Sequence, residues 1–131
     1  MFLPVSCVTE PQRPRRLLAS RAMRFSEYQE LSRRTATYPD AGDNIVYPTL
    51  GLAGEAGEVA EKVKKLMRDD GGVMSDERRA ALAGELGDVL WYVAQVATEA
   101  GLDLEELAQS NLDKLLSRQR RGVLSGSGDS R

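Results

Sequence analysis

Residues 52–59 read Leu-Ala-Gly-Glu-Ala-Gly-Glu-Val, and residues 82–89 repeat the pattern as Leu-Ala-Gly-Glu-Leu-Gly-Asp-Val. Seven of the eight positions agree when the second acid of each copy, Glu or Asp, is counted as equivalent. At about 100° per residue, each copy places its leucine and valine side chains in one stripe along a helix. The repeat therefore predicts two helices that are related by a local pseudo-two-fold and pack through their stripes.

Each of these helices also carries two acids beside its apolar stripe. Glu55 and Glu85 border the stripes, and Glu58 and Asp88 follow three residues later on the same flank. Two carboxylates ~4 Å apart in a partly protein environment repel each other by about 4 kcal/mol. A hard divalent cation such as Mg2+ offsets that repulsion. A lone pair of acids is most often a solvated face, but two matched pairs predict a metal site.

Glycines alternate with these acids at Gly54, Gly57, Gly84 and Gly87. Each costs up to ~1 kcal/mol relative to alanine inside a helix, so we expect a backbone or a ligand to approach closely there. The other helical acids are interpreted as parts of solvated faces: Glu61, Glu77, Glu99, Glu105 and Glu106.

The wider pattern predicts an all-α, four-helix bundle-like fold with short connections. The expected helices run from Ser26 to a point before Tyr38, from about Thr49 to Arg68, from Ser75 to about Ala100, and from Asp103 or Leu104 to about Arg120. The end of the chain, residues 125–131, is too polar and glycine-rich for a helix interior.

The chain has 131 residues, 41% of them apolar, which suits one domain with a modest core. Residues 1–22 carry four arginines and one acid, and are interpreted as a disordered extension or as a start assigned too early, with Met23 as the true start. Residues 23–131 are expected to form the domain. They hold 14 basic and 19 acidic side chains, and such an acidic body is a poor binder of nucleic acid.

The chain contains one cysteine, Cys7, and no histidine. The lack of histidine excludes histidine bases and histidine-ligated zinc. A single cysteine forms no internal disulfide, so a cytoplasmic location is expected. No apolar run approaches the ~20 residues that a membrane span needs, so no membrane association is expected.

The four acids resemble the signature of the MazG-like family of all-α nucleoside triphosphate pyrophosphohydrolases, which is Glu-x-x-Glu, a spacer, and Glu-x-x-Asp. Here it reads Glu55-Ala-Gly-Glu58, 26 intervening residues, and Glu85-Leu-Gly-Asp88. The resemblance covers residues 25–131, including the stretch from Asn111 to Lys114. One departure is Gly54, where many members have a further Glu, and this leaves the number of metal ions open.

The resemblance implies hydrolysis of a nucleoside triphosphate between its α- and β-phosphates, in the cleansing of nucleotide pools. It implies Mg2+, with Mn2+ as a substitute, held by Glu55, Glu58, Glu85 and Asp88. It also implies that helices from two or more subunits complete the site, as in a homodimer or homotetramer.

The general base is expected to be a carboxylate or a hydroxide on the metal, and Glu55 is the preferred candidate because it borders the apolar stripe. Tyr92 lies on the same flank, where it would contact substrate or pack in an interface, and Trp91 lies on the far side as a helix or subunit contact. Basic side chains that would contact the substrate are Lys62, Lys114 and Arg118, and the resemblance implies such a contact for Lys114 together with Asn111. Each of the three basic side chains among them also fits a solvated face.

Two alternatives stay open at this point. A phosphoribosyl-ATP pyrophosphohydrolase shares the fold and the acidic pattern. A non-catalytic helical interaction module would use the acidic helices for assembly. A calcium sensor is excluded because residues 69–72 lack the ligand spacing of an EF-hand loop.

Overall fold

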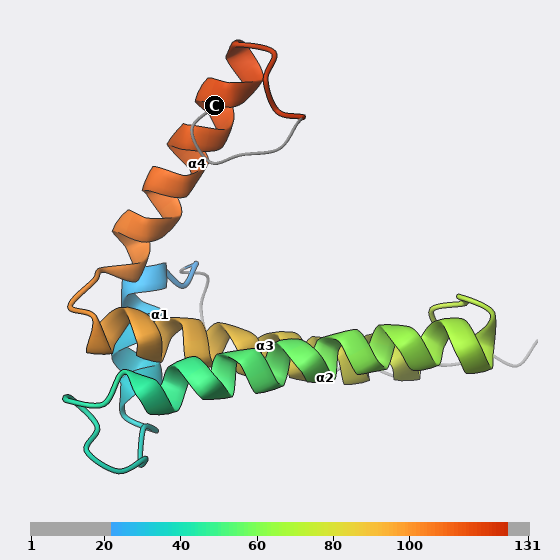
Figure 1. Cartoon of the computed structure of the whole chain (residues 1–131), viewed down its shortest axis with the longest axis horizontal. Helices are drawn as coiled ribbons and strands as arrows, with labels where there is room; N and C mark the ends of the chain where they lie inside the picture. The colour runs from blue at the N-terminus through green and yellow to red at the C-terminus, as the bar shows by residue number, and fades with distance from the viewer. Residues whose placement is uncertain (1–21, 126–131) are drawn as a thin grey trace, which may run out of the picture.

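The computed structural model describes residues 22–125, and its regular structure is entirely helical (Figure 1). The elements are α1 (Phe25–Arg33), α2 (Val46–Asp70), α3 (Asp76–Glu99) and α4 (Leu104–Arg120). No strand occurs among the described residues, so the predicted all-α fold class is confirmed. The interpretation of residues 1–22 as an extension falls outside the described range, apart from Ala22.

α2 and α3 form an antiparallel pair along the long axis of the molecule (Figure 1). Gly71 and Gly72 turn the chain between them with φ angles of 59° and 83°, in the left-handed region that favours glycine. The Ser75 hydroxyl then caps α3 by accepting a hydrogen bond from the Arg78 backbone N–H at 3.1 Å. The Arg78 guanidinium pairs with Asp70 across the turn at 2.6 Å. Local chemistry thus defines the hairpin that places the two acidic copies opposite each other.

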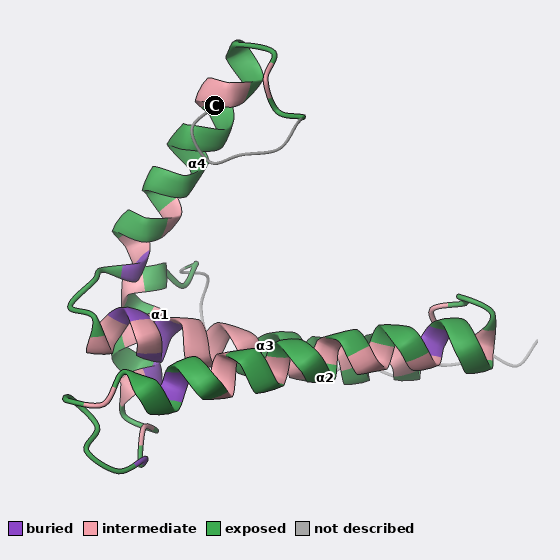
Figure 2. Cartoon of the chain, viewed as in Figure 1, coloured by how far each residue is buried: buried purple, intermediate pink, exposed green. Residues whose placement is uncertain are grey.

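The core lies where α1 and the start of α4 meet the C-terminal part of α3, and Figure 2 shows buried residues gathered at this corner. Ala94, Ala97 and Leu104 are buried there, and Tyr28 and Val93 pack against them. This corner anchors α1 and the beginning of α4 to the helix pair.

α4 leaves the corner and projects away from the helix pair (Figure 1). Its leucines after the buried Leu104 remain 40–49% exposed, at Leu107, Leu112, Leu115 and Leu116. Exposed leucines along a projecting helix are typical of an interaction surface.

Two helix starts lie earlier than the sequence predicts. α1 begins one residue before Ser26, and α2 begins three residues before Thr49. The N-cap side chains of α1 and α2 accept no hydrogen bond from a backbone N–H of the first turn. At the start of α2, the Asn44 side chain accepts from the Tyr47 backbone N–H at 3.1 Å. At the start of α1, the backbone N–H of Ser26 donates to Glu105, 79 positions along the chain, at 3.1 Å. A cap supplied from a distant helix leaves no local signal, which explains the misplaced start of α1.

Among residues 22–125, no helix combines the length and the apolar composition that crossing a lipid bilayer requires.

Candidate metal and nucleotide site

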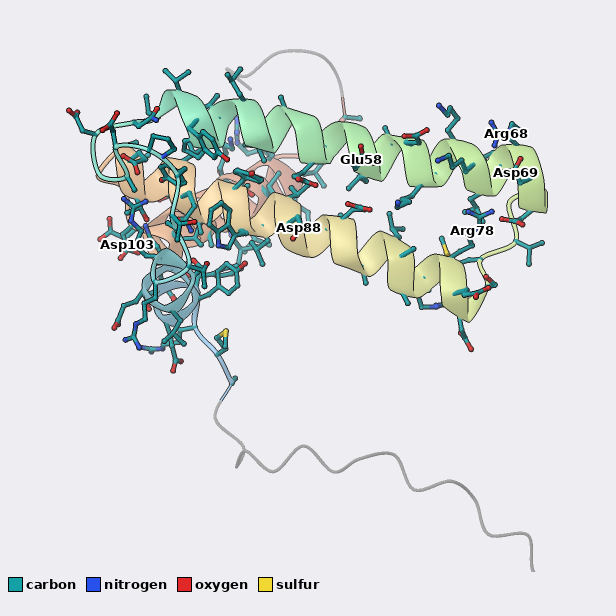
Figure 3. The ribbon with its side chains drawn as sticks, turned by 90° about the horizontal axis from the view of Figure 1, so that it is seen from below. Glu58, Arg68, Asp69, Arg78, Asp88 and Asp103 are labelled. Atoms are coloured by element: carbon teal, nitrogen blue, oxygen red, sulfur yellow. The ribbon has the colours of Figure 1, made fainter. Side chains whose placement is uncertain are left out.

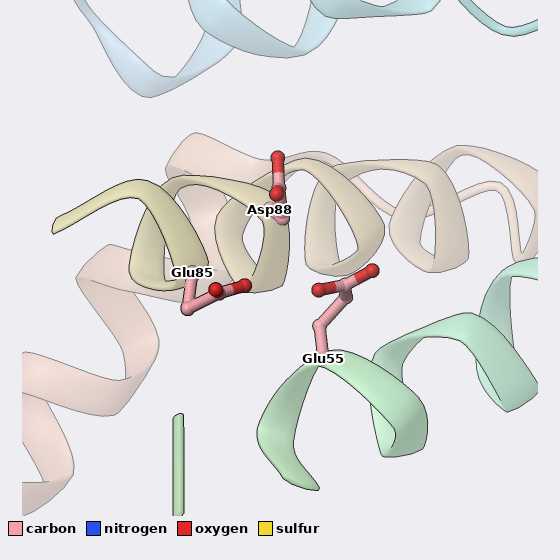
Figure 4. A group of neighbouring side chains, drawn as sticks. All are labelled: Glu55, Glu85 and Asp88. Carbon is pink, nitrogen blue, oxygen red and sulfur yellow. The ribbon is translucent and has the colours of Figure 1, made fainter. Parts of the chain in front are cut away.

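Three carboxylates from α2 and α3 meet in the middle of the helix pair. Glu55, Glu85 and Asp88 each offer an oxygen, and these oxygens all lie within 4.8 Å of one another. Figure 4 shows Glu55 reaching from α2 toward α3, where Glu85 and Asp88 stand one turn apart. The two acids of α3 share a flank because residues three positions apart on a helix do so. Acids from both copies of the repeat therefore converge, as the repeat predicts. We call these three residues the carboxylate cluster.

Glu58 is not part of this cluster. It lies one turn after Glu55 and is exposed, and Figure 3 shows it on α2 across from the helix that carries Asp88. Its charge still reaches the cluster, since it contributes to the raised pKa of Glu55. The expectation that Glu55 is the less exposed acid of the pair is confirmed. A role for Glu58 as a metal ligand stays a prediction.

The carboxylate cluster is electrostatically strained in the metal-free chain. Loss of contact with water raises the pKa of Glu55 above its ordinary 4.5, and the charges of Asp88, Glu85 and Glu58 raise it further. Carboxylate oxygens are the ligands that Mg2+ prefers, and Mg2+ keeps its other positions for water or phosphate. The donor set therefore fits a hard divalent cation.

Lys62 lies beside the cluster, as its place on the helix predicts. Its ammonium forms an ion pair with Glu85 at 2.9 Å between α2 and α3. The Glu85 hydrogen bond and charge, and to a smaller extent the charges of Glu58 and Glu61, raise the pKa of Lys62. Lys62 therefore pairs with a carboxylate that a bound cation would also contact.

Tyr92 packs against α2 one turn beyond Asp88. A Cβ atom added to Gly51 would lie 2.1 Å from Tyr92 Cε1, so only glycine lets the tyrosine ring lie there. Burial raises the pKa of Tyr92, and the neighbouring Tyr47, Glu55 and Asp88 add to this rise. The ring thus packs between the helices close to the cluster, and a contact with substrate stays a prediction.

Trp91 contacts the segment that joins α1 to α2, and its role in a helix or subunit contact stays a prediction. Its indole N–H donates to the Thr35 hydroxyl at 2.8 Å, just after the end of α1.

The prediction of close backbone packing at the four repeat glycines is wrong within this chain. A Cβ atom added at any of them meets no described atom within 4 Å outside its own helix backbone: Gly54, Gly57, Gly84 and Gly87. The side chain of the opposite helix instead meets α2 at Gly51, the residue directly before the first copy of the repeat. The repeat glycines instead leave an open surface beside the carboxylates.

The three candidate substrate contacts near the end of the chain belong to α4: Asn111, Lys114 and Arg118. Asn111 and Lys114 are exposed and line one shallow hollow with Leu107 and Ser110. Because α4 projects away from the α2–α3 pair, the structure does not bring these residues to the carboxylate cluster within one chain (Figure 1).

The interpretation of Glu99 as part of a solvated face is wrong. Its side chain is 1% exposed rather than solvated. It accepts hydrogen bonds from the Tyr38 hydroxyl and from the backbone N–H groups of Gly42 and Asn44, and it pairs with Arg33 at 2.9 Å. These contacts tie the loop before α2 to the end of α3. A lone acid near a helix C-terminus gives no sequence signal of such a role.

The fold and the cluster together define a class, an all-helical protein with a candidate cation site built from facing helices. Residues 48–123 match the family model of the MazG nucleotide pyrophosphohydrolase domain. The chain belongs to this family, whose members generally depend on a divalent metal. It is 51% identical over 114 residues to the "Gene 37 protein" of Mycobacterium phage L5, a match that covers 83% of this chain and all of the relative. No solved structure matches the chain at a significant level.

Proposed function

We propose that this protein hydrolyses nucleoside triphosphates, ribo- or deoxyribo-, to the nucleoside monophosphate and pyrophosphate in a Mg2+-dependent reaction. The observation that carries the proposal is the meeting of Glu55, Glu85 and Asp88 from the two copies of the repeat. Membership of the MazG family supports the reaction class. Removal of unwanted nucleotides from the cellular pool is the role that this chemistry suits.

The cation would be held by Glu55, Glu85 and Asp88, with Glu58 available on the exposed flank. Mg2+, or Mn2+ in its place, would supply charge neutralisation at the phosphate oxygens and so favour in-line attack by water. Three carboxylates without histidine suit this hard cation better than zinc or copper.

The protein's own groups would handle the proton and the phosphates. Glu55 is the proposed general base because it is partly shielded from water and faces the acids of α3. It takes a proton from the attacking water as the bond between the α- and β-phosphates breaks, and pyrophosphate leaves. Lys62 would contact the phosphates, and Tyr92 would bound the pocket on the α2 side.

A second copy of the chain would complete the site. Asn111, Lys114 and Arg118 lie on a helix that points away from their own carboxylate cluster. The exposed leucines of that helix supply an apolar surface for a homodimer or homotetramer. Association would let α4 of one copy present its polar side chains to the cluster of another.

The test is pyrophosphate release from a panel of NTPs, dNTPs and phosphoribosyl-ATP, with and without Mg2+. We expect Mg2+-dependent release from one or more nucleoside triphosphates. Glu58→Ala and Glu85→Gln should lower kcat/KM by more than about 100-fold, which is about 2.7 kcal/mol of barrier. Glu77→Gln, an exposed acid at the start of α3, is the matched control and should retain activity. Folded protein with no release from any nucleotide would favour the non-catalytic module, and release from phosphoribosyl-ATP alone would favour that substrate.

A further inference from the structure

Lys62 occupies an unusual position for a helix-surface lysine. Its ammonium lies 2.9 Å from Glu85 Oε1 on the opposite helix, and the two side chains are only 31% and 19% exposed. It also follows Glu58 by four residues, the spacing at which a glutamate supports a lysine on a helix. One ammonium group therefore sits among acids of both copies of the repeat.

The partner of Lys62 is itself a member of the carboxylate cluster. Glu85 offers an oxygen within 4.8 Å of oxygens of Glu55 and Asp88. A divalent cation drawn to these oxygens would approach the ammonium closely. Unit charges ~4 Å apart repel by about 1 to 4 kcal/mol between bulk water and a protein surface, and a dication doubles that figure. The ammonium and the dication are therefore competitors for Glu85.

We propose that Lys62 is the resident counterion of the metal-free site, which a divalent cation must displace from Glu85 and which the displacement frees to bind a substrate phosphate. This inference rests on the proposed function. The lysine side chain suits the exchange because its charge sits on a flexible four-carbon stem. Because the Lys62 ammonium competes for Glu85, the cation is bound weakly until a triphosphate binds and its phosphates pair with the ammonium.

Lys65 provides the comparison on the same helix. It pairs with Glu61 at 3.3 Å, within α2, and both side chains are 40% exposed. Neither residue belongs to the carboxylate cluster. Removal of the Lys65 charge therefore changes the surface of α2 without changing the partner of Glu85.

The experiment measures Mn2+ affinity in the absence of nucleotide, by calorimetry and by electron paramagnetic resonance, for wild type, Lys62→Met and Lys65→Met. Methionine keeps the length of the stem and removes the charge. We expect Lys62→Met to bind Mn2+ about five- to tenfold more tightly than wild type, and Lys65→Met to match wild type. A residue with a merely structural role would not produce a gain in affinity when removed.

A second readout is the melting temperature. Without metal, Lys62→Met should melt below wild type, because Glu85 loses its partner, and saturating Mn2+ should raise its melting temperature by more than it raises that of wild type. Unchanged or weaker Mn2+ binding by Lys62→Met would overturn the counterion role while leaving the metal site intact. Absence of Mn2+ binding by both wild type and Lys62→Met would contradict the proposed function itself.

Discussion

At the scale of single residues, repulsion within the carboxylate cluster lowers the stability of the fold, and the same carboxylates can bind a cation. Loss of contact with water raises the pKa of Glu55 most, and the nearby charges of Asp88 and Glu85, with that of Glu58, raise it further. A raised carboxyl pKa means that ionisation above pH 4.5 costs the folded state free energy, so the metal-free protein carries this cost at neutral pH.

Glu55→Gln should therefore raise the melting temperature and abolish the activity. We expect the metal-free variant to melt a few degrees higher than wild type at pH 7, because the substitution removes one charge from the cluster. The same variant should lose nearly all pyrophosphate release, since glutamine accepts no proton from water. Calorimetry and the release assay on one preparation check both effects. A metal-free variant that melts lower, or one that retains turnover, would remove Glu55 from its assigned role.

Glu99 shows the opposite electrostatic situation. Hydrogen bonds from Tyr38, Gly42 and Asn44, with the Arg33 guanidinium, hold its pKa at about 2. A lowered carboxyl pKa stabilises the fold at every pH above the ordinary value of 4.5, and this stabilisation is lost as pH falls from 4.5 toward 2.

Glu99→Gln should accordingly melt several degrees below wild type at pH 7, because Arg33 loses its charged partner. The difference should shrink as the pH falls from about 4.5 to about 2, where wild type itself becomes protonated. Melting curves across this pH range provide the check. A constant difference at all pH values would show that the carboxylate charge is not the stabilising feature.

At the scale of helices, the α2–α3 contact depends on one glycine rather than on the four of the repeat. The Tyr92 ring fills the space where a Gly51 side chain would stand. Gly84 faces open space, so only its backbone freedom matters to stability.

Gly51→Ala should therefore destabilise the protein by about 1–3 kcal/mol through overpacking. Gly84→Ala should stabilise it by up to about 1 kcal/mol through helix propensity. Denaturant unfolding of the two variants beside wild type measures both changes. Equal effects of one sign would mean that Tyr92 does not define the helix contact.

The helices could be predicted from sequence where their caps are local. Ser75 and Asp103 cap α3 and α4 through backbone N–H groups three residues later, and both helices begin where the sequence predicts. The start of α1 lacks such a cap, and at the start of α2 the Asn44 side chain accepts from the Tyr47 backbone N–H at 3.1 Å. Convergence of Glu55, Glu85 and Asp88 could also be predicted, because an internal repeat places the same face of two adjacent helices in contact.

The sequence predicts the apolar stripes but does not predict which parts of them are buried. Leu66 of α2 is buried, but Val63 of the same helix is 43% exposed and Leu86 of the second copy is 51% exposed. Helical periodicity identifies an apolar face without stating whether this chain or another copy covers it. The position of α4 could not be predicted for the same reason.

At the scale of the whole molecule, many apolar side chains of the described residues are exposed to solvent. The buried apolar side chains within residues 22–125 are few: Tyr38, Leu66, Ala94, Ala97 and Leu104. The leucines of α4 that follow Leu104 are 40–49% exposed, and the helix itself projects from the body (Figure 1). Association of copies would bury this surface.

The double substitution Leu112→Glu with Leu116→Glu should therefore produce a monomer near the 14.4 kDa chain mass. Wild type should elute with at least twice that mass, and Glu77→Gln, an exposed position at the start of α3, should match wild type. Size-exclusion chromatography with light scattering measures all three. Wild-type protein that is monomeric throughout the micromolar range would contradict a site shared between copies.

The most direct test of the account is the position of Mn2+ in a crystal of the wild-type protein, located by its anomalous scattering. The account predicts a peak in contact with carboxylate oxygens of Glu55, Glu85 and Asp88, between α2 and α3. A peak bound to other residues, with these three carboxylates free of metal at saturating Mn2+, would contradict it.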